Sequence, residues 1–113
     1  MLPTPDEFLA KVYSYGHLKV GEKGYSGGVD FVCETIDDLC LASEWGTIKD
    51  ILAKSDLDKM GTMSIHLLVF SSWAKKESID IEWAKFRDKV HAWWLKHEPA
   101  DRVAQLFQGL TDE

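Results

Sequence analysis

The sequence predicts an all-α fold, a single compact bundle of five to six helices with one glycine-rich loop. Apolar residues recur at three- and four-residue steps through most of the chain, which is the spacing of amphipathic helices. Capping residues precede several of these segments, and glycine follows them. At 113 residues the chain is too short for two independent cores, so we expect residues 1–113 to form one helical domain.

The first helix is expected over residues 4–15. Thr4 is suited to cap it, Pro5 suits the first helical position, and Glu7 completes a capping-box pattern. Gly16 is expected to end this helix.

A glycine-rich connector is predicted for residues 16–28. Five of its thirteen residues are glycine, which argues against a regular helix there. The same composition permits a small hairpin within 17–26, turning around Gly21 and Gly24.

Two amphipathic helices are predicted next, over residues 29–42 and 43–55. The first has an apolar face and an opposite acidic face. Ser43 is a suitable cap for the second. Trp45 is expected to point inward from the second helix.

Residues 63–76 form the most apolar stretch of the chain. Its apolar side chains point all round a helix, so such a helix would lie buried at the centre. A buried strand fits residues 64–70 almost as well. No comparable partner strand occurs elsewhere in the sequence, which favours the helix.

The last two helices are expected over residues 79–97 and 100–108. On a helical wheel Trp93 and Trp94 both fall on the apolar face, whereas His91 and His97 point about 120° apart and lack the spacing of a metal-binding pair. His97 is expected near the helix C-terminus, where the helix dipole favours a cationic ring. The core is predicted around seven side chains: Trp45, Leu68, Trp73, Trp83, Phe86, Val90 and Trp94.

The net charge and the cysteines indicate which partners and which cellular compartment to expect. A net charge of −6 argues against direct nucleic-acid binding. Cys33 and Cys40 would lie about 10 Å apart along a helix, too far for a disulfide, which is typical of cytoplasmic thiols. The first residues lack a signal-peptide pattern and no run of 18 apolar residues occurs, so we expect a cytoplasmic protein without membrane contact.

No metal or cofactor site is expected from the motifs. The segment from Asp56 to Leu67 matches a calcium-binding loop at positions one, three and six but fails at positions five and twelve, so helix capping explains its acids better. The spacing from Gly16 to Gly21 resembles a phosphate loop, but Glu22 stands where a lysine is required.

The one directional surface feature is an acidic face on the helix predicted over 29–42. We interpret it as a docking surface for a basic protein partner, with a simple solvated helix face as the alternative. The chain would then be a non-catalytic interaction module, such as an acidic inhibitor or an immunity- or antitoxin-like protein, and a second copy of the chain is a further candidate partner. The expected partner-binding residues are Asp30, Glu34, Asp37, Asp38 and Glu44.

The alternative hypothesis is a small enzyme or metal-dependent domain. It would use His66 or His91 as acid or base together with acidic side chains, because a neighbouring carboxylate tunes imidazole toward neutral pH. Active sites assemble from distant residues, so the lack of a local motif does not exclude this class.

Overall fold

The computed structural model describes residues 2–110, apart from the side chain of Glu77, and confirms the predicted all-α fold. No strand occurs within this range. The elements in chain order are α1 (Pro5–Tyr15), α2 (Tyr25–Leu41), α3 (Trp45–Lys54), α4 (Leu57–Met60), α5 (Met63–Ser71), the π-helical segment η1 (Lys75–Ile79), α6 (Asp80–His97) and α7 (Ala100–Phe107).

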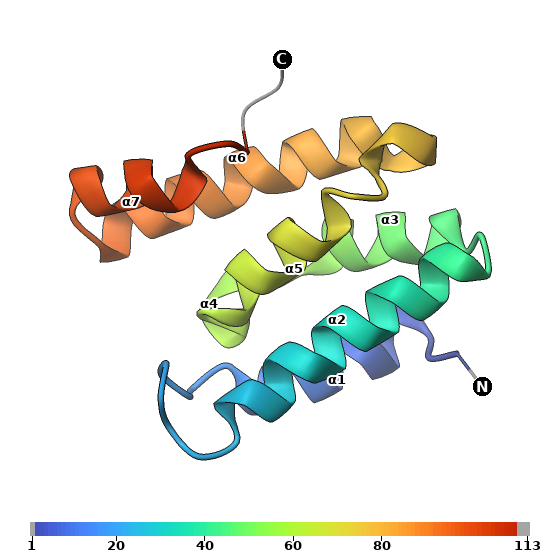
Figure 1. Cartoon of the computed structure of the whole chain (residues 1–113), viewed down its shortest axis with the longest axis horizontal. Coiled ribbons are helices and arrows are strands. Elements are labelled where there is room, and N and C mark those ends of the chain that lie inside the picture. The colour runs from blue at the N-terminus through green and yellow to red at the C-terminus, as the bar shows by residue number, and fades with distance from the viewer. Residues whose placement is uncertain (1, 111–113) are drawn as a thin grey trace.

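The helices form three rows in a flat body of 38 × 36 × 19 Å (Figure 1). Helices α1 and α2 pack together along one edge, and α6 and α7 pack together along the opposite edge. The middle row holds α3 and α5. Helix α3 contacts α1, α2 and α6, and α5 contacts α2 and α6, so the middle row joins the two edges.

Helix α1 begins as its sequence predicts. The Thr4 hydroxyl accepts the backbone N–H of Glu7, and the Glu7 carboxylate accepts the backbone N–H of Thr4, so the capping box is complete. Gly16 follows the last helical residue. A local pattern was sufficient here because every participating group lies within one turn.

The glycine-rich connector is shorter than predicted, and the expectation of a hairpin within 17–26 is wrong. Turns occupy the segment before Tyr25, where α2 begins four residues earlier than expected. Gly27 and Gly28 therefore lie inside a helix. Gly28 is buried against Tyr15, and a Cβ at this position would lie 2.7 Å from Cγ of that ring. The glycine serves close packing of α2 on α1, which outweighs its weak helix propensity.

Two backbone segments approach closely at a pair of glycines, which we call the glycine crossing. Gly16 lies where the chain leaves α1, and Gly61 lies in the turn between α4 and α5. A Cβ on Gly61 would lie 2.4 Å from the carbonyl oxygen of Gly16, and a Cβ on Gly16 would lie 1.9 Å from the carbonyl oxygen of Lys59. Gly61 also has φ +55° and ψ −134°, a conformation that favours glycine. The crossing fixes the start of the connector against the α4–α5 turn.

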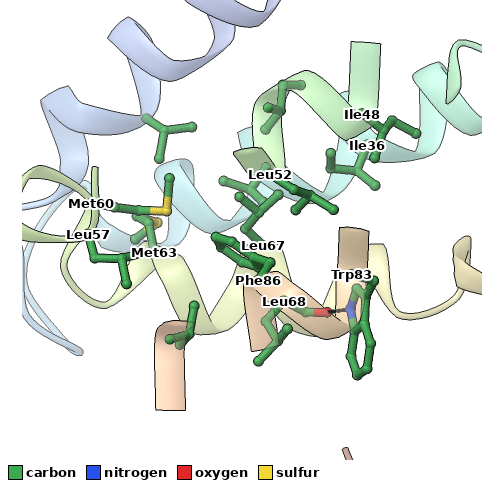
Figure 2. Close-up of a cluster of buried hydrophobic side chains, with 14 of the residues drawn as sticks. Ile36, Ile48, Leu52, Leu57, Met60, Met63, Leu67, Leu68, Trp83 and Phe86 are labelled. Atoms are coloured by element: carbon green, nitrogen blue, oxygen red, sulfur yellow. Dashed lines mark hydrogen bonds between the residues drawn. The ribbon is translucent and has the colours of Figure 1, made fainter. Parts of the chain in front are cut away.

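The core is centred on α5, which confirms the helical prediction for this stretch. Leu67 and Leu68 of α5 are fully buried, among side chains from α2, α3, α4 and α6 (Figure 2). The indole N–H of Trp83 on α6 donates to the carbonyl oxygen of Leu68 at 2.9 Å. A second α6 indole, that of Trp94, donates to the buried Ser64 hydroxyl of α5 at 3.1 Å.

Several local predictions are corrected. Trp73 was expected in the core but is 72 % exposed, because α5 ends at Ser71 and the helical spacing no longer applies. Trp45 and Trp93 are only half-buried. Ser43 does not cap α3, since it has a positive φ of 56° and Glu44 takes the cap position.

The placement of His97 in the last turn of α6 is confirmed. Its Nδ1 lies 2.8 Å from the carbonyl oxygen of Trp93, and its ring stacks on the Trp93 ring. Asp56 caps α4, as its capping interpretation predicts, by accepting the backbone N–H groups of Asp58 and Lys59. Among residues 2–110, no helix is both long and apolar enough to cross a membrane.

The glycine crossing predicts a large loss of stability for Gly61→Ala. The new Cβ would overlap the Gly16 carbonyl oxygen in a backbone conformation that alanine avoids, so we expect the free energy of unfolding to fall by about 2–4 kcal/mol. Urea denaturation measures the change. Gly27→Ala is the matched control: its Cβ meets open space within a helix, so stability should rise by about 0.5 kcal/mol. Equal effects of the two substitutions would contradict the close approach.

The different environments of Trp83 and Trp73 predict a large and a small effect of substitution on stability. Trp83→Phe removes a fully buried ring edge and its hydrogen bond to Leu68, which should lower the free energy of unfolding by about 1–3 kcal/mol. Trp73→Phe changes an exposed ring and should stay within about 0.5 kcal/mol of the parent. Thermal and urea unfolding of both variants test the contrast, and a larger loss at Trp73 would contradict its exposed position.

Candidate functional site

The predicted acidic face is a stripe along the exposed side of α2. Asp30, Glu34, Asp37 and Asp38 are all exposed, and the spacing of the first three follows the helix surface. Glu44 lies beyond the end of α2, where its carboxylate accepts the Thr47 hydroxyl proton at 3.3 Å. The structure thus presents all five predicted partner-binding side chains to solvent.

Positive charge is missing from this part of the sequence. Residues 24–48 contain these five acids and no lysine, arginine or histidine. Among the side chains that the structure describes, no ion pair involves the stripe carboxylates; the ion pairs lie elsewhere, as Lys49–Glu82, Lys54–Asp6 and Arg87–Asp88. The stripe therefore keeps its negative potential toward solvent.

An exposed aromatic group lies beside the stripe. A small hollow next to Asp37 is walled by Cys33 and Cys40 of α2 and by Phe70 and Trp73 at the end of α5. The Phe70 and Trp73 rings meet edge to face at 5.7 Å. Leu41, at the end of α2, is 79 % exposed. We call the group Asp30, Glu34, Asp37, Asp38, Leu41 and Trp73 the acidic–aromatic surface.

Sequence reasoning missed the exposure of Trp73. The apolar run before Trp73 suggested that the same helical face continued into the core. The polar stretch around Trp73, SSWAKK, was the available signal, because a helix surrounded on all sides by core seldom ends in consecutive serines and lysines.

His66 occupies a different place, on the wall of a pocket of about 520 Å³. Its Nε2 lies 2.6 Å from the hydroxyl oxygen of Tyr25, at the start of α2. Burial lowers the pKa of His66 below its ordinary value, because the ring loses solvation of its charged form. The acid–base hypothesis expected Glu34, Asp37 or Asp38 as the acidic neighbour of His66, but none of the three lines this pocket, whose carboxylate is that of Glu98.

His91 has an apolar neighbour instead. Its ring meets the Phe107 ring edge to face at 4.8 Å, where α7 packs on α6. His91 does not line the pocket of His66. Within the described residues, no three side chains of histidine, cysteine, aspartate or glutamate gather closely enough to hold a metal ion. Cys33 and Cys40 are both partly buried on α2.

Comparisons of the chain with protein-family models, curated proteins and solved structures find no match. The function must therefore be argued from the surfaces and pockets of the chain itself.

The burial of His66 predicts a specific pH dependence. Its folded-state pKa lies below 6.5, so the unfolded chain takes up a proton at this position at a higher pH than the folded protein does. The contribution of His66 should therefore lower the free energy of unfolding as the pH falls from about 7 toward 5. His66→Gln should remove this part of the decline. An NMR titration of the imidazole that gave a pKa at or above 6.5 would contradict the assignment.

Proposed function

We propose that the protein is a non-catalytic interaction module that binds a basic protein partner through the acidic–aromatic surface. The observation that carries the proposal is the exposed Trp73 beside a row of carboxylates that have no cationic partner among the described residues. An inhibitor of immunity or antitoxin type is the specific form that this arrangement favours, because such a protein acts by covering a basic surface.

The carboxylates supply long-range attraction and orientation. Complementary charge raises association rates and disfavours partners of the wrong sign. Lysine and arginine side chains of the partner would pair with Asp30, Glu34 and Asp37 along one helix face. Exposed pairs of this kind contribute little each, so charge alone would give weak and salt-sensitive binding.

The apolar members of the surface supply the remaining binding energy. Tryptophan is enriched among residues that dominate binding at protein interfaces. A guanidinium of the partner could stack on the exposed Trp73 ring while pairing with Asp37, which lines the same hollow. Leu41 extends the apolar area at the end of the stripe.

A basic partner fits this surface better than a second copy of the chain does. In a two-fold dimer the same patch faces itself. Two acidic stripes would then lie against each other, and like charges at an interface cost several kcal/mol. Self-association through this surface should therefore be weak near neutral pH.

The cytoplasm is the compartment that we infer for this interaction. Cys33 and Cys40 of α2 both line the hollow. Seven residues apart on one helix, they lie about 10 Å apart along its axis, too far for a disulfide between them, which is typical of proteins in reducing compartments.

The proposal is tested by charge reversal. Tagged protein captures partners from a lysate of its source, a salt series releases them, and an identified partner is then titrated in pure form by calorimetry. We expect Asp37→Lys with Asp38→Lys to weaken binding at least about tenfold, and Trp73→Ser to weaken it by a similar factor.

The matched control is Asp80→Lys with Asp101→Lys. Both positions are exposed and lie outside the acidic–aromatic surface, and the net charge changes equally, by four units from −6 to −2. The control should retain most of the affinity. A partner that binds the Asp37/Asp38 and Trp73 variants as tightly as the parent would disprove the proposed surface.

A further inference from the structure

The pocket beside His66 has a charge opposite in sign to the net charge of the chain. The chain has a net charge of −6, yet Lys19 and Arg102 both line this pocket, with Glu98 as its single acid. Neither cationic side chain forms an ion pair among the residues that the structure describes. With a neutral imidazole the pocket walls thus carry a net charge of +1, from two cations and one carboxylate.

The walls between these charges are largely apolar. Val20, Ile65, Trp94 and Leu106 contribute to the lining, and they come from the connector, α5, α6 and α7. A volume of about 520 Å³ lies in the range of small-molecule sites, which combine an apolar lining with a few polar groups. Inorganic phosphate alone would leave most of this lining uncovered.

Two hydrogen-bonding side chains that line the pocket, Tyr25 and Trp94, already have partners within the chain. The Tyr25 hydroxyl is engaged with His66 Nε2 at 2.6 Å, so Nδ1 is the imidazole nitrogen left for a further partner. The indole N–H of Trp94 is engaged with Ser64, so the ring offers the pocket its apolar surface. The cations are therefore the main groups available to an incoming anion.

We propose that this pocket binds a small carboxylate with a compact apolar or aromatic body. The carboxylate would pair with Lys19 and Arg102, and the body would lie against Trp94, Ile65 and Leu106. The site is separate from the acidic–aromatic surface, so this proposal does not depend on the proposed docking function.

The test uses three probes in calorimetric titrations of the full chain. The probes are 1-naphthaleneacetate, the uncharged 1-naphthaleneacetamide and inorganic phosphate. We expect the carboxylate to bind about tenfold or more tightly than the amide, because a charge-assisted hydrogen bond is lost. Phosphate should bind more weakly than the naphthyl carboxylate, because it covers none of the apolar lining.

Two variants locate the binding site. Lys19→Gln with Arg102→Gln should weaken binding of 1-naphthaleneacetate about tenfold or more. Lys76→Gln with Lys85→Gln removes the same charge outside the pocket and should leave the affinity within about twofold, since distant exposed charges are screened by salt. Equal binding of acid and amide, tighter binding of phosphate, or equal losses in the two double variants would overturn the proposal.

Discussion

The structure depends on the burial of α5, a helix that is apolar on nearly every side. Such a helix has no strongly polar face, so α2, α4 and α6 pack around it, and one side that includes Ile65, His66, Val69 and Phe70 stays partly exposed. Its two buried serine hydroxyls donate to nearby backbone: Ser64 to the Gly61 carbonyl oxygen and Ser71 to the Leu67 carbonyl oxygen. The indole N–H groups of Trp83 and Trp94 then fix α6 on α5 through directional bonds.

The same packing determines where the two candidate sites lie. Helix α2 runs beside α5, with Tyr25 next to His66 toward one end and Cys40 near Phe70 toward the other. The cationic pocket therefore forms where the connector and α7 close over one end of this pair. The acidic–aromatic surface runs along the exposed side of α2 to the opposite end, where the chain leaves α5 and exposes Trp73. One helix pair thus separates two surfaces of opposite charge.

Sequence patterns correctly predicted the features that depend on interactions between neighbouring residues. The Thr4 capping box and the helical α5 follow from residues within a turn or two of one another. Gly28 was assigned to the connector because the need for glycine there comes from its contact with Tyr15 on another helix. Residue spacing along the sequence does not reveal such a contact. The Tyr25–His66 pair joins residues 41 positions apart, so the sequence offered His66 as a candidate without its partner. The acidic residues were predictable because exposed charge on a helix needs no tertiary contact.

The absence of lysine from residues 24–48 also determines how this surface reacts with chemical reagents. Amine-directed cross-linkers have no target on the acidic stripe, and trypsin leaves the whole of α2 in one peptide between Lys23 and Lys49. Reagents that activate carboxylates or alkylate thiols would instead modify that peptide, which carries both cysteines. On this chain, a complex formed at the stripe would escape an amine-based footprint and be revealed by a carboxylate-based one.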